Sequence, residues 1–147
     1  MDILNNIEWY FDVPTNAVMR DTRKHLTTEQ LNTIVFDDSK EDNVTFCLPL
    51  NEHFIFSKTK ELPRPINVRQ ILYLIYNFYN SPLNAECFES AFENNEEWLE
   101  ELIYRYDGDT TEIKNVDVFV DINCAPDFSG LIFDEKSNEY FVGIGPE

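Results

Sequence analysis

The stretch Ile66–Leu83, INVRQILYLIYNFYNSPL, decides the fold, because it concentrates apolar residues in a strongly acidic chain. Between Val68 and Tyr79 it holds nine apolar or aromatic residues in twelve. The apolar positions follow the i, i+3, i+4, i+7 spacing of one helix face. A membrane span needs about 20 apolar residues, so this stretch is too short and too interrupted to be one. The pattern predicts a buried helix over 68–79.

Both ends of this helix carry recognisable signals. Asn67 and Gln70 have the spacing of a capping box, and Ile66 and Ile71 have that of a hydrophobic staple. Asn-Ser-Pro at 80–82 stops the helix. A helix apolar on so much of its circumference is expected to be covered on two sides, by a sheet and by another helix.

Tyr73 and Tyr76 flank the apolar face of the predicted helix. They have two readings. Either they belong to the edge of the core, or they line a surface that binds a partner, which includes a second copy of the chain. The width of the apolar stripe favours the core.

The segments around the helix predict an α+β fold. Alternating or continuous apolar runs predict strands at 44–49, 53–57 and 116–123, and a hairpin within 130–145 that turns near 136–138. Further helices are predicted at 28–33, at 84–93 and after Asn94, and 57–65 reads as a basic, Pro-containing connector. Strands, then helices, then strands predict an antiparallel sheet with two to four helices on one face, in a single domain over 1–147.

Composition and charge exclude several classes of function. The net charge of −17 repels nucleic-acid phosphates and anionic membrane surfaces, so neither is expected as a direct partner. The three cysteines are odd in number and form no CxxC pair, which predicts reduced thiols in a cytosolic or nuclear setting. The first residues carry no basic region and no long apolar run, so no signal peptide is expected.

More than half of the charge lies in one stretch, 84–112, which holds ten acids against Arg105. This acidic stretch reads either as the solvated face of amphipathic helices or as a docking surface for a basic partner, including mimicry of nucleic-acid phosphates. The candidate contact residues are Glu86, Glu89, Glu93, Glu96, Glu97, Glu100 and Glu101.

A second candidate site follows the predicted strand 116–123. Asp121 and Asn123 lie on one face, about 7 Å apart at about 3.3 Å per residue, and a divalent ion bridging them with Asp127 would make a metal site. The composition of 123–127 is also that of an ordinary turn, which is the simpler interpretation.

The segment VRQILYLIYNFYNSPL, Val68–Leu83, resembles a segment in uncharacterised proteins of giant DNA viruses of the mimivirus type. The resemblance implies a viral origin and a life in the cytoplasm of the infected cell. It brings no catalytic motif with it.

No G-x-S-x-G, P-loop, HExxH or GxGxxG motif occurs in the chain. The sequence therefore predicts a non-enzymatic accessory protein that acts through protein–protein contacts, with no cofactor. Two alternatives stay open: an acidic decoy that binds basic proteins, and a small metal-dependent hydrolase that uses the region 121–127. Self-association is compatible with each of them.

Overall fold

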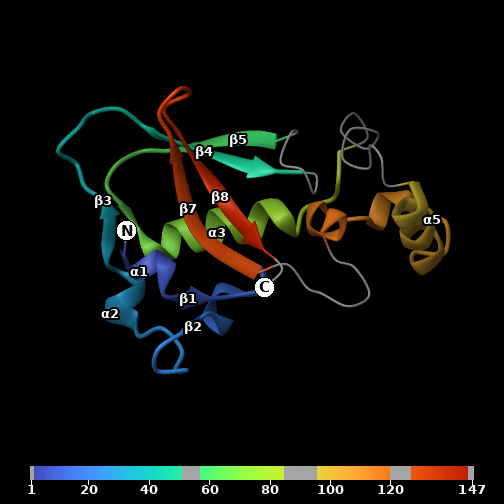
Figure 1. Ribbon diagram of the computed structural model, residues 1–147, viewed down its shortest axis with the longest axis horizontal. Helices are drawn as coiled ribbons and strands as arrows, with labels where there is room; N and C mark the ends of the chain where they lie inside the picture. Colours follow the sequence, from blue (N-terminus) through green and yellow to red (C-terminus); the bar gives the residue numbers. More distant parts are fainter. Residues whose placement is uncertain (1, 51–56, 85–95, 120–126, 146–147) are drawn as a thin grey trace.

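The computed structural model describes residues 2–50, 57–84, 96–119 and 127–145 (Figure 1). Its centre is a four-stranded sheet in the order β5-β4-β8-β7, with helix α3 packed along one face. The strands are β4 (Val44–Pro49), β5 (Ser57–Leu62), β7 (Asp127–Asp134) and β8 (Glu139–Gly145), and α3 spans Val68–Tyr79. The predicted α+β class is confirmed.

The sheet is antiparallel at two of its three strand pairings. β4 pairs antiparallel with β5, and β7 pairs antiparallel with β8. The middle pairing, β4 with β8, is parallel and sets Phe46 beside Tyr140. The sheet is therefore mixed where the sequence predicted only antiparallel strands, because β4 and β8 are not neighbours in the chain and no hairpin joins them in an antiparallel pairing.

Helix α3 begins and ends where the sequence predicts. Asn67 and Gln70 form the reciprocal capping box, and Asn80 caps the other end. The buried face points at the sheet and contains Val68, Ile71, Leu72, Ile75 and Tyr79. The hydroxyl of Tyr79 donates to the backbone carbonyl of Pro49, at 2.9 Å, and so ties the end of the helix to the end of β4.

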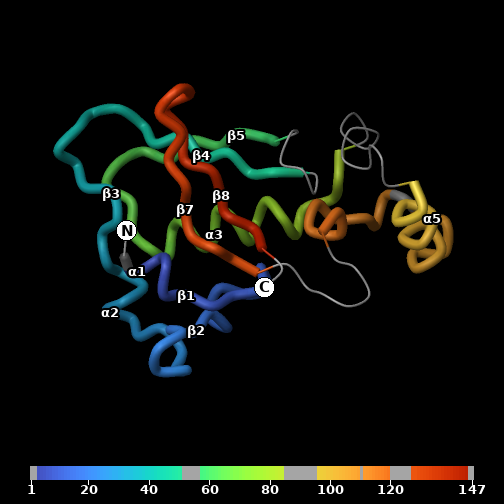
Figure 2. The backbone as a smooth tube through the Cα atoms, viewed as in Figure 1, coloured from blue at the N-terminus to red at the C-terminus, as the bar shows by residue number. Residues whose placement is uncertain are grey.

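Short elements of the N-terminal third pack around this core (Figure 2). They are α1 (Asp2–Asn5), β1 (Ile7–Glu8), η1 (Pro14–Asn16), β2 (Val18–Met19), α2 (Thr28–Leu31) and β3 (Ile34–Phe36). β1 pairs with β2, and β3 pairs with β6 (Ile66–Asn67) just before α3. Thr27 and Gln30 form a capping box at the start of α2, within the helix predicted at 28–33.

A second, smaller hydrophobic cluster lies beside the first, around α5 (Glu96–Arg105) and the 3₁₀ helices η3 (Thr110–Glu112) and η4 (Asn115–Val118). Its buried members are Leu50, Leu83, Trp98, Leu102, Ile113 and Val118. Phe78 and Phe119 pack against both clusters. A single domain over 1–147 stays a prediction.

Two sequence predictions of local structure are wrong. The alternating segment at 116–123 begins in the 3₁₀ helix η4 instead of a strand, because the Asp117 carboxylate accepts from the backbone N–H of Lys114 and turns the chain. The predicted connector at 57–65 contains β5, whose lysines suit an edge strand. The predicted helix at 84–93, the strand residues 53–56 and the rest of 120–123 lie outside the described residues.

No described helix has both the length and the apolar composition that a bilayer crossing requires.

Candidate interaction site on the open face of the sheet

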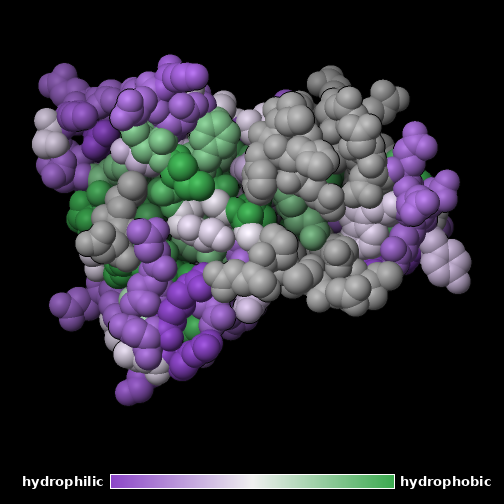
Figure 3. All heavy atoms as spheres, in the orientation of Figure 1, coloured by the Kyte–Doolittle hydropathy of each residue, from purple (hydrophilic) through white to green (hydrophobic). Residues whose placement is uncertain are grey.

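The register of the sheet divides its side chains between two faces. Phe46, Leu48 and Val142 point at α3 and are buried in the core. Cys47 pairs with Phe141, and Phe141 pairs with Ile132, so these three side chains share the opposite face, here called the open face. Figure 3 shows hydrophobic atoms on this side of the molecule, below the hydrophilic tip of the β7–β8 hairpin.

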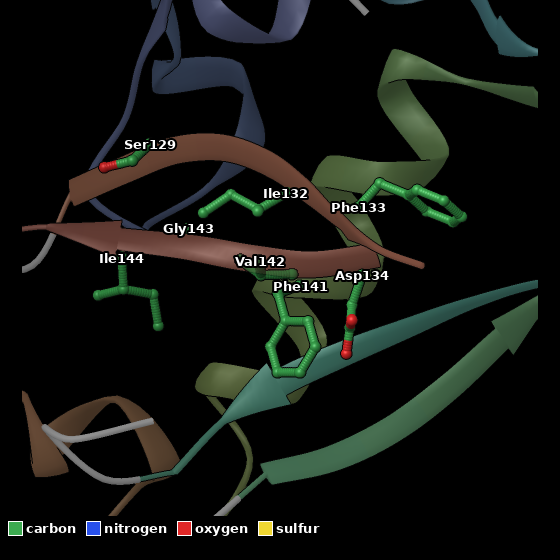
Figure 4. Close-up of a pocket in the computed structure, with 8 residues that line it drawn as sticks. All are labelled: Ser129, Ile132, Phe133, Asp134, Phe141, Val142, Gly143 and Ile144. Carbon is green, nitrogen blue, oxygen red and sulfur yellow. The ribbon is translucent and has the colours of Figure 1, made fainter. Parts of the chain in front are cut away.

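A groove of about 510 Å³ runs along the β7–β8 hairpin and is here called the hairpin groove. Its lining is mostly apolar and consists of Ser129, Ile132, Phe133, Asp134, Phe141, Val142, Gly143 and Ile144 (Figure 4). Two of these apolar side chains are exposed, Ile132 at 62 % and Phe133 at 43 %. Figure 4 shows Phe141 and Asp134 side by side on neighbouring strands.

A β-bulge in β7 turns Ile132 outward. Phe128 pairs with Ile144 and Leu131 pairs with Val142, so two residues of β7 stand opposite one residue of β8. The extra residue keeps both Phe128 and Leu131 on the helix face, and it places Ile132 on the open face. Gly130 sits in the bulge at φ +89°, where a Cβ atom would come within 2.5 Å of the Asn5 side chain.

The hairpin tip beside the groove is acidic and well ordered by local bonds. Asp134, Glu135 and Glu139 stand against the single base Lys136. The Asp134 carboxylate accepts from the backbone N–H of Lys136 and from the hydroxyl of Ser137, which fixes the turn. A partner that reaches this tip meets a negative potential.

Cys47 is the buried thiol of the open face. It donates to Glu139 Oε2 at 2.6 Å. Burial raises the pKa of Cys47 to about 12, and the hydrogen bond and negative charge of Glu139 act in the same direction. The sulfur is therefore a protonated thiol at neutral pH and does not act as a thiolate nucleophile there.

We expect Cys47 in the folded protein to react with iodoacetamide about a thousandfold more slowly than an unfolded thiol, since each pKa unit lowers the thiolate fraction tenfold. Glu139→Gln should raise this rate, because the negative charge that opposes the thiolate is gone. The measurement is mass spectrometry of the peptide that contains Cys47 after timed labelling. An unchanged rate in Glu139→Gln would contradict the role given to this carboxylate.

The raised pKa of Cys47 also makes the stability of the folded protein depend on pH. The pKa of Cys47 is raised above its ordinary value of 9.0, so its neutral form stabilises the folded state below that pH. This contribution is lost as the pH rises from about 9 towards 12.

The predicted acidic residues are partly visible on α5. Glu96, Glu97 and Glu100 are exposed, while Glu101 is half-buried and accepts from Arg105 at 3.2 Å in an i, i+4 pair. Glu86, Glu89 and Glu93 lie outside the described residues. Tyr104, which the sequence reading did not single out, is 86 % exposed on the same helix.

Tyr73 and Tyr76 lie on α3 and contact each other with their rings 6.5 Å apart. Tyr73 is exposed at the edge of the helix, and Tyr76 is half-buried and packs against the main core. These tyrosines and the glutamates of α5 therefore belong to different helices, and the open face of the sheet uses neither set.

Of the predicted metal ligands, Asp127 is described, and Asp121 and Asn123 are not. Asp127 is only 3 % exposed at the start of β7, and its Oδ2 lies 3.8 Å from Nη2 of Arg20. The carboxylate thus already faces a cation of this chain. Within the described residues, no three acidic, histidine or cysteine side chains gather around a point where a metal ion fits. The hydrolase alternative rests on the two undescribed positions and stays a prediction.

The hairpin groove was missed by sequence reading, although one signal was present. Leu131, Ile132 and Phe133 are three consecutive apolar residues in a strand, and side chains alternate between faces. At least one of them therefore points away from a one-sided core.

Comparison with known proteins gives no relative from which a function can be carried over. The sequence matches no protein-family model and no curated protein, and the structure matches no solved structure.

Proposed function

We propose that this chain is a non-enzymatic accessory protein that binds a partner protein through the hairpin groove. The observation that carries the proposal is the exposure of Ile132 and Phe133 on the edge strand β7, beside an apolar groove of about 510 Å³. Folded proteins usually protect edge strands from other chains, and exposed apolar side chains that line an apolar groove mark a candidate binding site.

The negative charge of the chain indicates what kind of partner surface would bind. The chain carries −17 in total, and the hairpin tip adds local negative charge next to the apolar groove. A partner surface that combines apolar side chains with lysine or arginine satisfies both features. A second copy of the chain brings another −17 and is repelled, so a basic partner is favoured over self-association.

The acidic decoy is the second candidate, and one feature of α5 favours it. Tyr104 is 86 % exposed on the helix that also exposes Glu97 and Glu100, and tyrosine is enriched among residues that dominate binding energy. A basic protein held there would depend strongly on salt, because exposed charges are screened within about 10 Å at moderate ionic strength.

Paired variants separate the two surfaces. Ile132→Glu places a charge in the hairpin groove, and the double variant Glu97→Lys/Glu100→Lys reverses the charge of α5. Thr59→Glu is the matched control, because it adds the same charge on the open face of β5. Partners captured by the wild type are identified, purified and titrated against each variant at low and high salt.

We expect Ile132→Glu to weaken binding by about tenfold or more, a cost of about 1.4 kcal/mol, while Thr59→Glu leaves it unchanged. Equal affinity of the wild type and Ile132→Glu would refute the hairpin groove as the binding surface. Loss in the α5 variant together with loss at high salt would establish the decoy function instead.

We further propose that the protein acts in the cytoplasm of a virus-infected cell. The resemblance of 68–83 to giant-virus proteins and the odd number of cysteines support this setting.

A further inference from the structure

We propose that the partner contributes an extended segment that adds to the sheet as a fifth strand, along the outer edge of β7 at residues 131–134, and that this segment is apolar with basic residues at the end beside the hairpin tip. This inference rests on the proposed function and specifies how the hairpin groove recognises its partner.

Among the described residues, contacts to the outer edge of β7 lie along the first half of the strand. The strand order places β7 at one end of the four-stranded sheet. At the start of the strand, the N–H of Phe128 donates to the backbone carbonyl of Trp9, and Gly130 packs closely against Asn5. In the described part of the chain, no backbone hydrogen bond crosses this edge at 131–134.

This second half of β7 therefore offers a strand template. Successive residues of a strand point their backbone groups to alternate sides, so about half of the N–H and C=O groups of 131–134 face outward. Strand addition to such an edge is an established mode of peptide recognition, in which backbone hydrogen bonds supply affinity and alternate side chains supply specificity.

The side chains of β7 define what the added strand carries. Ile132 is exposed on the open face, while Phe133 is exposed on the other face, where its ring stacks 4.9 Å from Tyr140. An added strand alternates between the same two faces, so consecutive residues of it contact apolar surface. A recognised segment therefore holds at least two adjacent apolar residues.

Charge defines the end of the segment that lies beside the hairpin tip. Asp134 and Glu135 follow the apolar residues of β7 at the hairpin tip, and opposite charges placed across neighbouring strands stabilise their pairing. Basic residues beside the apolar core of the segment meet these acids. The same acids disfavour a second copy of the hairpin, whose tip carries the same charge.

The probe for this inference is a synthetic peptide, Lys-Lys-Val-Val-Val-Lys-Lys, added to the full-length protein. Amide hydrogen exchange, followed by NMR, reports which backbone groups become bonded. We expect alternate amides within 131–134 to become protected by about tenfold or more on binding, while exchange in α5 stays unchanged.

Two N-methylated peptides supply a matched control. Methylation of either the second or the third valine removes one N–H and leaves charge and composition the same. Adjacent N–H groups of a strand point to opposite sides, so one analogue should bind about tenfold more weakly and the other should bind like the parent. A peptide with glutamate in place of lysine tests the charge and should not bind.

Several results would overturn strand addition. One is binding of the peptide with no protection at 131–134 and equal affinity of both methylated analogues. Another is the absence of binding by the parent peptide, and a third is protection of these amides in a dimer without peptide. Each of them leaves the proposed function intact, because that proposal is decided by the natural partner and Ile132→Glu.

Discussion

Replacing Phe46 by alanine is expected to lower the free energy of unfolding by about 3–5 kcal/mol. Phe46 is 0 % exposed in the middle of β4. Its ring centroid lies 5.9 Å from that of Phe36 and 6.5 Å from that of Tyr140. Phe46 and Tyr140 are partners in the parallel pairing that joins the two halves of the sheet. The neighbouring side chains are fixed to their own backbone and cannot fill the cavity left by the ring. The folded state therefore loses the hydrophobic transfer free energy of the ring and also bears the cost of the cavity.

Urea denaturation followed by circular dichroism measures this loss. Phe46→Leu is the control, because it keeps most of the apolar volume and should cost about 1 kcal/mol or slightly more. The ring of Tyr140 also contacts Phe133, at 4.9 Å. Damage at Phe46 is therefore expected to loosen the hairpin groove as well. A loss below about 1 kcal/mol for Phe46→Ala would show that the core is not organised around this ring.

Arg20→Ala is the second change with a large expected effect, a loss of about 3 kcal/mol at neutral pH. Arg20 follows β2 and connects three segments of the chain. Its Nε donates to the carbonyl of Ile7 at 3.3 Å, its Nη2 donates to the carbonyl of Phe128 at 3.4 Å, and Nη2 lies 3.8 Å from the carboxylate of Asp127. Removing the guanidinium leaves a buried carboxylate without this cation, which is more costly than the attraction alone.

A double variant tests this reason. Arg20→Ala/Asp127→Asn replaces the carboxylate by a neutral amide of the same shape, so it should recover about 1 kcal/mol or more relative to Arg20→Ala. Thermal and urea unfolding of the single and double variants provide the comparison. If the double variant is less stable than Arg20→Ala, the buried charge is not the source of the loss.

The sequence predicted elements that local signals define. Helix α3 carries its own capping box, its own stop and a continuous apolar stripe, and the structure reproduces all three. The hairpin of β7 and β8 was predicted with its turn for the same reason, since Asp134 and the residues after it form a local turn. These features depend on neighbours within a few residues.

Features that depend on distant residues were not predicted. The Val-Asp-Val alternation at 116–118 has the period of a strand, yet Asp117 bonds both to the Lys114 N–H and to the Tyr106 hydroxyl and holds a 3₁₀ helix. The parallel pairing of β4 with β8 joins segments with no local signal for each other. Tertiary contacts decide these cases, and the periodicity of apolar residues along the sequence does not report such contacts.

The candidate site belongs to the second group. The hairpin groove depends on which face Ile132 occupies, and that depends on the bulge opposite β8. Strict alternation from the buried Phe128 would place Ile132 in the core.

The bulge has a consequence for how such a surface can arise. Before the bulge the even-numbered residues of β7 face the core, and after it the odd-numbered residues do. One extra residue therefore decides which side chains of the strand face inward. If the intact strand paired with β8 without the bulge, Leu131 would turn to solvent and Ile132 would be enclosed. Deletion of one residue between Phe128 and Leu131 would instead remove the bulge and keep both of these pairings, so the open face would survive the loss of one codon at this point.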